Sequence, residues 1–296
     1  MKRKTWLIVL AILAGLCCVA GIVIYLTIEN TPPNPWTAES GYHVRGSKVY
    51  YYPGFGISDP FEIRDAHAGS FVVIDSSYAL DRSHVYVDGM IIPEADPATF
   101  EVFDFTFTRD ADHVFLRERV FSDDPAHFEN VAPNIYRDTR HVYWSADIVS
   151  DDPSNLVVVG AADFYTYFKD STTVFVNGNP VEGADPATFS VVRDGFSRDA
   201  THIFYFASMI PEADASTFEV IESPFARDAA HAYWMQNVIP EADPDTFVVL
   251  NANFECSADA VHAYYQATLI PGFDPASIPV SATVNSCDET RIYFTP

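Results

Sequence analysis

The sequence predicts an all-β protein made of tandem repeats, and three observations support this fold class. An Asp recurs at intervals of 29, 28, 32, 29, 29, 31 and 29 residues, which indicates repeats of about 29 residues. The apolar runs are short and rich in β-branched and aromatic residues, as in strands. No window after residue 30 keeps a helical period for three turns, and prolines recur throughout. The recurring positions are Asp81, Asp110, Asp138, Asp170, Asp199, Asp228, Asp259 and Asp288.

One complete copy of the motif is the segment FARDAAHAYWMQNVIPEADPDTF, residues 225–247. Its parts are an aromatic residue, Asp-x-x-His, a short apolar run, a turn, and Pro-Glu-Ala-Asp-Pro-x-Thr-Phe. In two copies, residues 84–92 (HVYVDGMII) and 174–181 (VFVNGNPV), an Asp-Gly or Asn-Gly pair separates two apolar runs. Such pairs favour two-residue hairpin turns, so each copy is predicted to contain a tight β-hairpin.

The run after each His is apolar at consecutive positions, as in residues 85–87, 142–144, 203–205 and 232–234. A strand with one solvent face would alternate apolar and polar residues, so this strand is predicted to lie between two neighbouring copies. A single copy is too small to bury a core of its own, and stacking supplies it.

Stacked β-meanders form either an open, solenoid-like array or a closed β-propeller. Propeller blades usually need about 40 residues, and closure is often helped when one end of the chain completes a sheet begun at the other. The first and the last copy of this repeat region both contain the strand that normally follows the His, so neither end evidently supplies a strand that the other lacks. We therefore expect an open curved array, with the propeller as the alternative.

Composition excludes some classes of partner. The 296-residue chain is 48% hydrophobic and has a formal charge of −24. Residues 31–296 hold 14 basic and 40 acidic side chains. This surface would repel a phosphate backbone, so nucleic acid is not an expected partner. Basic proteins, cationic ligands and metal ions remain compatible with it.

The N-terminus predicts a membrane anchor. Residues 1–5 form a basic tip, residues 6–28 are uncharged and long enough to span a bilayer, residues 29–41 are a proline-rich spacer, and residues 42–296 are the repeat region. A cleaved signal peptide is the alternative, but the apolar run is longer than usual and lacks a small-x-small end. The basic tip predicts a cytoplasmic N-terminus and an extracytoplasmic repeat region, in the periplasm or on the cell surface.

The four cysteines fall into two groups. Cys17 and Cys18 lie in the apolar N-terminal run, whereas Cys256 and Cys287 lie one repeat apart in the last two copies. A Cys256–Cys287 disulfide is plausible in an oxidising compartment, but the sequence leaves the pairing open.

The recurring Asp-x-x-His pair is the candidate site. Transition-metal binding, pH sensing and acid–base catalysis are the functional interpretations. The structural interpretation has each Asp accepting main-chain hydrogen bonds, with the His ring bonded to main chain beside the aromatic strand. We favour it because a catalytic site is normally unique, and we assign no catalytic, metal or cofactor residue. The column comprises His84, His113, His141, His202, His231 and His262, with Asp81, Asp110, Asp138, Asp199, Asp228 and Asp259.

The Pro-Glu-Ala-Asp-Pro segments offer acidic oxygens of the kind that bind calcium. They lack the dense alternating Asp/Asn spacing of calcium loops, so an Asp-Pro turn is the preferred interpretation. The common hydrolase, phosphate-loop and dinucleotide motifs are absent from the sequence.

The motif resembles that of the DKNYY family of bacterial repeat proteins. The resemblance spans roughly residues 48–294 and is closest at DRSHVY (81–86), DAAHAYW (228–234) and DAVHAYY (259–265). Ala, Arg, Ser or Thr replaces the Lys and Asn of the family core. The family has no established activity, so the resemblance implies the repeat organisation and no mechanism.

Together these features predict a membrane-anchored, extracytoplasmic binding or scaffold module for an envelope protein or polymer, with no catalysis and no cofactor. One alternative is an envelope hydrolase whose site lies in a divergent copy, either the first or the one containing residues 160–170. The other is a metal-binding or structural stalk.

Overall fold

A computed structural model describes residues 19, 31–162, 165–250 and 254–295. Apart from Val19, the predicted membrane segment and the basic tip lie outside the described residues. In the part of the chain that is described, no helix has the length and hydrophobicity needed to cross a membrane.

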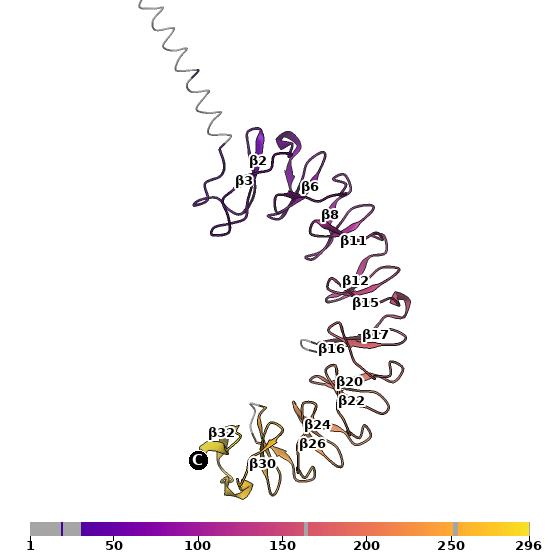
Figure 1. Cartoon of the computed structure of the whole chain (residues 1–296), viewed down its shortest axis with the longest axis vertical. Helices are drawn as coiled ribbons and strands as arrows, with labels where there is room; N and C mark the ends of the chain where they lie inside the picture. The colour runs from indigo at the N-terminus through magenta and orange to yellow at the C-terminus, as the bar shows by residue number, and fades with distance from the viewer. Residues whose placement is uncertain (1–18, 20–30, 163–164, 251–253, 296) are drawn as a thin grey trace, which may run out of the picture. The chain divides into compact units, whose positions relative to one another are not determined.

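The chain forms two compact units, one ending at Phe128 and the other beginning at Glu129. Each contains small antiparallel sheets whose strands follow one another in chain order (Figure 1). In residues 31–162, 165–250 and 254–295 the only helical elements are three 3-10 turns, which confirms the all-β prediction. They are η1 (Ala68–Ser70), η2 (Pro153–Asn155) and η3 (Pro275–Ser277).

The first unit has one three-stranded and two four-stranded sheets in its described residues. The strands are β1 (Gly41–Arg45), β2 (Lys48–Tyr52) and β3 (Phe61–Glu62); β4 (Val72–Val73), β5 (Tyr78–Leu80), β6 (Val85–Val87) and β7 (Met90–Ile91); and β8 (Glu101–Val102), β9 (Thr108–Arg109), β10 (Val114–Leu116) and β11 (Arg119–Ser122).

The second unit continues this plan with five four-stranded sheets and a final hairpin. The strands are β12 (Glu129–Ala132), β13 (Ile135–Arg137), β14 (Val142–Trp144) and β15 (Asp147–Ser150); β16 (Val157–Ala162), β17 (Tyr165–Lys169), β18 (Val174–Val176) and β19 (Asn179–Pro180); β20 (Ser190–Arg193), β21 (Phe196–Arg198), β22 (Ile203–Tyr205) and β23 (Ser208–Met209); β24 (Glu219–Glu222), β25 (Phe225–Arg227), β26 (Ala232–Trp234) and β27 (Asn237–Val238); β28 (Val248–Val249), β29 (Cys256–Ala258), β30 (Ala263–Tyr265) and β31 (Thr268–Leu269); and β32 (Thr283–Asp288) and β33 (Arg291–Thr295).

The third and fourth strands of each complete sheet are joined by two residues. At Asp88-Gly89 and Asn177-Gly178 both residues have positive φ, between 47° and 79°, as a type I′ hairpin turn requires. The predicted hairpins are therefore confirmed. In another sheet, Pro224 lies in the turn between β24 and β25, and Met235 lies in the turn between β26 and β27. The Met235 N–H donates to the carbonyl oxygen of Pro224 at 2.8 Å, so the two hairpin turns of a sheet lie at the same end of its strands. We call this end of the strands the hairpin edge, and we call the opposite end, which carries the Asp-x-x-His turn, the Asp edge.

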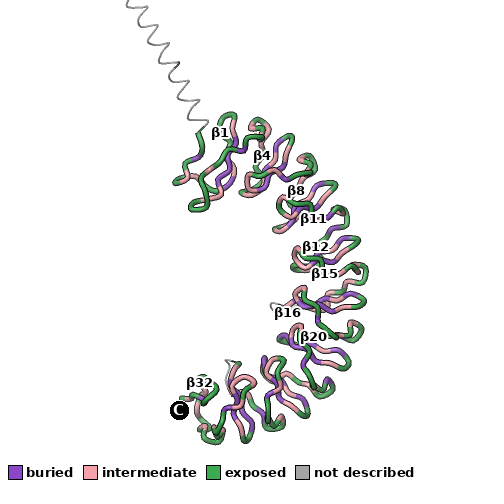
Figure 2. Tube along the Cα trace, in the orientation of Figure 1, coloured by how far each residue is buried: buried purple, intermediate pink, exposed green. Residues whose placement is uncertain are grey.

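The core lies between successive sheets, and β26 shows how. Tyr233 packs with Phe196 and Ile203 of the preceding sheet, whereas Ala232 packs with Tyr264 of the following sheet. The third strand is therefore covered on both faces, as predicted. Burial concentrates on the central strands and exposure on the turns (Figure 2). Each layer of core belongs jointly to two copies.

The described part of the proline-rich segment packs against the first sheet. Pro33 is buried, and the carbonyl oxygen of Pro35 accepts a hydrogen bond from the Tyr52 hydroxyl at 2.8 Å. Tyr52 is almost completely buried. This segment thus serves as a cap for the repeats.

Glycine at the hairpin turn also permits close approach between sheets. A Cβ added to Gly178 would lie 2.5 Å from ring atoms of Trp144 in the preceding sheet, and Gly178 has a φ of +77°. We predict that Gly178→Ala lowers the free energy of unfolding by about 2–4 kcal/mol, because strain at positive φ adds to overpacking. Urea denaturation of the full chain measures this change.

Gly272→Ala is the matched control, because Gly272 has a φ of +70° and open space around it. It should lose only the backbone term, about 1 kcal/mol. Equal losses for the two variants would show that the approach of Gly178 to Trp144 does not limit side-chain size.

Candidate functional site

The turn Asp accepts hydrogen bonds in each copy, and it is buried in every copy except the last, where Asp288 is partly exposed. The side chain of Asp228 is completely buried. Its Oδ1 atom accepts from the N–H groups of Ala230 and His231 at 2.8 and 2.7 Å. Its Oδ2 atom accepts from the Asp214 N–H at 2.9 Å and the Tyr233 hydroxyl at 2.6 Å. One carboxylate therefore holds its own turn, its own third strand and the connector that leads into its sheet.

The bond from the connector to the turn Asp recurs in both units. The donors to Oδ2 are the N–H groups of His67, Asp96, Asp185 and Asp243, and the acceptors are Asp81, Asp110, Asp199 and Asp259 in that order, at 2.7–3.0 Å.

A second bond recurs beside the first. The Thr of the Asp-Pro-x-Thr segment accepts, through Oγ1, the N–H of the residue after the turn Asp, as Thr246 does from Ala260 at 3.1 Å. Both recurring parts of the motif thus connect one copy to the next.

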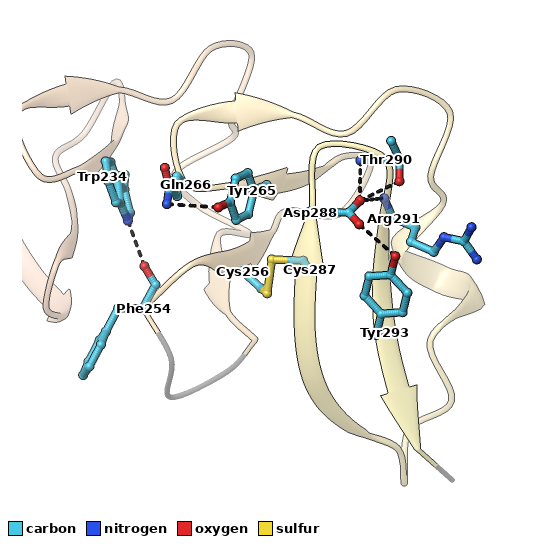
Figure 3. Close-up of a disulfide and its surroundings, with 10 residues drawn as sticks. All are labelled: Trp234, Phe254, Cys256, Tyr265, Gln266, Cys287, Asp288, Thr290, Arg291 and Tyr293. Carbon is cyan, nitrogen blue, oxygen red and sulfur yellow. Dashed lines mark hydrogen bonds between the residues drawn. A yellow bond between two sulfur atoms is a disulfide. The ribbon is translucent and has the colours of Figure 1, made fainter.

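The tyrosine five residues after the turn Asp is a functional part of the motif that the sequence analysis missed. Its hydroxyl donates to Oδ2 of the Asp at 2.6–2.8 Å. Figure 3 shows the last example, in which Asp288 accepts from Tyr293 and from the N–H groups of Thr290 and Arg291. The recurring Asp-x4-Tyr spacing was the available signal. The pairs are Asp81–Tyr86, Asp138–Tyr143, Asp228–Tyr233, Asp259–Tyr264 and Asp288–Tyr293.

The histidines lie at the rim of these clusters with partly exposed side chains. In His84, His141 and His231, Nδ1 lies 3.3–3.5 Å from the hydroxyl of the Tyr two residues later. We expected a main-chain partner for the His ring, and for these three histidines that expectation is wrong. The Asp oxygen nearest to Nδ1 of these three rings is 3.8–3.9 Å away. These three rings therefore border the Asp cluster without a short bond to the carboxylate, whereas Nδ1 of His202 lies 3.3 Å from Oδ2 of Asp199.

The hydrogen bonds determine the ionisation of the turn Asp. Burial of Asp228 raises its pKa, but the bonds from Tyr233 and from the N–H groups of Asp214, Ala230 and His231 outweigh burial and lower the pKa. At Asp199 the same balance, with donors from Asp185, Thr201 and His202, lowers the pKa to about 2. A carboxylate that is ionised and saturated with donors is poorly suited to act as a general base.

The structure distributes the candidate column as one Asp/His pair per turn. Within the described residues, no group of three or more His, Cys, Asp or Glu side chains is placed to hold a metal ion. The members of the column therefore do not converge on one centre.

The Pro-Glu-Ala-Asp segments form turns. Glu94, Glu212 and Glu241 have positive φ, and Gly183 and Gly272 occupy the equivalent position in other copies. Pro followed by a residue of positive φ is typical of a type II turn. The Asp that follows accepts local hydrogen bonds, as Asp96 does from Ala98 and Thr99. The predicted Asp-Pro turns are confirmed.

The last two sheets are joined covalently. A disulfide links Cys256 in β29 with Cys287 in β32, with the Cα atoms 5.8 Å apart (Figure 3). Both cysteines are buried in the core layer with Ile270 and Ile292. The structure thus contains the pairing that the sequence left open.

A groove of about 520 Å³ opens on the hairpin edge of the second unit. Ile221, Pro224 and Met235 supply apolar surface, and Phe254 is half exposed at its border. Charged and polar residues complete the lining; they are Arg193, Asp194, Tyr205, Glu222 and Ser223.

Two of the polar side chains of the groove, Arg193 and Ser223, donate to main-chain carbonyl oxygens. Arg193 donates to the carbonyl oxygens of Val220 and Ile221 at 2.6 and 3.1 Å. The Ser223 hydroxyl donates to the carbonyl oxygen of Asp194 at 3.3 Å. The hydroxyl of this serine is therefore used in a contact between two hairpin turns.

Comparison with known families agrees with the motif. The sequence model of the DKNYY family matches residues 24–119 and 116–237, which together are more than half of the chain. The chain belongs to the DKNYY family. A search of the curated proteins finds no match. The family assignment supports the repeat organisation of this DKNYY protein. It does not indicate a function, so the function must be inferred from the structure of this chain.

Removing the charge of one turn Asp should loosen a DKNYY repeat. We predict that Asp228→Asn lowers the free energy of unfolding by about 2–4 kcal/mol, because an amide cannot accept all four hydrogen bonds. Tyr233→Phe should cost about 1 kcal/mol, since one donor is lost. Phe115 and Phe204 already occupy the tyrosine position in other copies.

Asp245→Asn is the control, because Asp245 lies exposed in the connector of the same repeat. Chemical denaturation of the three variants ranks them. A loss for Asp228→Asn no larger than for Asp245→Asn would rule out the structural role of the turn carboxylate.

The lowered pKa values also predict acid sensitivity of the DKNYY repeats. For Asp199 the folded pKa of about 2 lies below the ordinary value of 3.8, so its stabilisation is complete above about pH 4 and is lost as pH falls towards 2. Asp81, Asp170, Asp228 and Asp259 are shifted in the same direction. The urea midpoint should therefore fall steeply between pH 4 and 2, and Asp199→Asn should flatten this fall. An unchanged profile in that variant would show that Asp199 does not contribute to it.

Proposed function

We propose that this DKNYY protein is a membrane-anchored, extracytoplasmic binding module for an envelope protein or polymer, without catalytic activity. The groove on the hairpin edge of the second unit carries the proposal. It combines apolar surface from Ile221 and Met235 with charge from Arg193 and Glu222, as sites for polypeptide or polymer segments do.

The charge of the chain favours a basic partner. Residues 31–296 contain 26 more acidic than basic side chains. Only some of these acidic side chains are buried in hydrogen bonds within the repeats. Exposed acidic groups such as Glu212 and Glu241 remain on the connectors. Electrostatic attraction of this kind raises the association rate of a basic partner and weakens as salt is added.

Two observations support the location. The uncharged run of residues 6–28 follows a basic tip, as in a single-pass anchor with a cytoplasmic N-terminus. The Cys256–Cys287 disulfide fits an oxidising compartment outside the cytoplasm.

Local strand pairing favours an open array over a propeller. β1 pairs with β2 and β33 pairs with β32, so each terminal strand is paired within its own sheet. A closed ring would be most stable if strands from the two ends of the chain formed one sheet, and these pairings do not join the two ends.

Site-specific photocrosslinking in intact cells tests the binding role. Phe254, which is half exposed beside the groove, is replaced by benzoylphenylalanine in the full-length chain. Val261 lies exposed at the Asp edge of the same sheet and receives the same replacement as the control. We expect a discrete crosslinked envelope component from position 254, weaker at high salt, and none from position 261.

Two results would contradict the proposal. One is the absence of a specific crosslink at position 254 under conditions in which the protein is folded and oxidised. The other is turnover of an envelope substrate by the purified full-length protein, which would favour the hydrolase alternative.

A further inference from the structure

Three large apolar side chains gather in solvent at the N-terminal cap of the first unit. Trp36, Phe55 and Ile57 are 77%, 71% and 74% exposed. The rings of Trp36 and Phe55 are in contact, with centroids 5.2 Å apart. Clustered exposed apolar groups mark interaction surfaces, whereas isolated ones need no explanation. We call these three residues the cap patch.

The chain builds the cap patch with a loop that occurs in the first sheet alone among the described sheets. Eight residues, 53–60, connect β2 to β3, whereas two residues make the equivalent connection in each four-stranded sheet. Gly54 and Gly56 have φ values of 125° and 82° and flank Phe55. This backbone presents Phe55 and Ile57 outward.

A tight turn presents the third side chain of the cap patch. The Asn34 side chain accepts the Trp36 N–H at 2.9 Å, and the carbonyl oxygen of Asn34 accepts the Ala38 N–H at 2.9 Å. Trp36 is therefore held in place at the surface although it contributes little to the core. Its position suits contact with another surface.

The nearest such surface is the bilayer from which the proposed anchor emerges. The apolar run ends at Ile28, eight residues before Trp36. Eight residues span at most about 28 Å, and prolines at 32, 33 and 35 limit their freedom. The cap patch must therefore stay close to the membrane surface.

The charge around the cap patch permits this contact. Residues 31–62 contain two basic and three acidic side chains, a net charge of −1, whereas residues 63–296 carry −25. Anionic lipid would strongly repel the acidic remainder but would repel this segment only weakly. Tryptophan and other large apolar side chains are also favoured at the level of the lipid headgroups.

From this combination we infer that Trp36, Phe55 and Ile57 insert into the outer interface of the bilayer and seat the first sheet on the membrane. The inference rests on the proposed membrane anchoring and adds a second, shallow contact to it. The contact limits the motion of the first unit relative to the bilayer, so that the spacer does not act as a free tether.

A fluorescent label at position 57 tests the inference in the full-length chain. Cys17→Ser and Cys18→Ser remove the N-terminal thiols, and Cys256 and Cys287 are joined in the disulfide. Ile57→Cys is then labelled with nitrobenzoxadiazole and reconstituted in vesicles of phosphatidylethanolamine and phosphatidylglycerol. Phe105→Cys is the matched control, because Phe105 is a fully exposed apolar residue of the same unit.

We expect the label at position 57 to have blue-shifted emission and several-fold weaker quenching by aqueous iodide than the label at position 105. Lipids with a spin label near the headgroup should quench position 57 selectively. Adding Trp36→Ser and Phe55→Ser should return position 57 to the aqueous values, with the disulfide and the circular dichroism spectrum retained as checks of folding.

Flotation of the vesicles separates the two ways in which the inference can fail. If the protein does not float with the vesicles, both the membrane anchoring and the seating are wrong. If it floats, but iodide quenches positions 57 and 105 equally, the anchoring stands and the seating is wrong. A shielded label that does not respond to Trp36→Ser and Phe55→Ser would also overturn the role of the cap patch.

Discussion

The structure depends on a buried, ionised carboxylate that in five copies joins the connector to the sheet it enters. Four donors surround Asp228, and they come from its own turn, its own third strand and the preceding connector. Such a group is costly to bury unless every lone pair is satisfied, which strongly disfavours other arrangements of these segments. The apolar layers add most of the burial, but they are less directional. The carboxylate is what sets the position of one copy relative to the next.

This constraint explains why the motif is uniform at the Asp edge and variable at the hairpin edge. The residues that fasten copies together must recur, whereas the hairpin turns tolerate Asp-Gly, Asn-Gly or non-glycine pairs such as Met235-Gln236. Variation between turns creates local surfaces, among them the groove beside Phe254 and the long loop that presents Phe55. Repeat proteins commonly place function on such variable positions of a constant frame. Both of our proposals lie on this edge or in the cap.

Much of the fold was predictable from the sequence because its signals are local. The Asp spacing, the Asp-Gly and Asn-Gly pairs and the two-sided apolar strand predicted repeats, hairpins and shared core layers. The role of the turn Asp was only partly predictable. Its bonds to Ala230 and His231 are local, whereas the donor at Asp214 lies fourteen residues earlier and comes from the preceding connector. The contact of the His ring with the Tyr hydroxyl joins residues only two positions apart, but it depends on the side-chain rotamers, which residue spacing does not specify.

Native-state hydrogen exchange at the connector amides tests the central role of the carboxylate most directly. Asp214 is an exposed residue, so exposure alone predicts a fast-exchanging amide. The hydrogen bond from its N–H to Asp228 predicts slow exchange instead, comparable with the core strand β26, and selective loss of this protection in Asp228→Asn. Fast exchange at Asp214 in the wild-type protein would show that the carboxylate does not hold the connector, and would contradict the account.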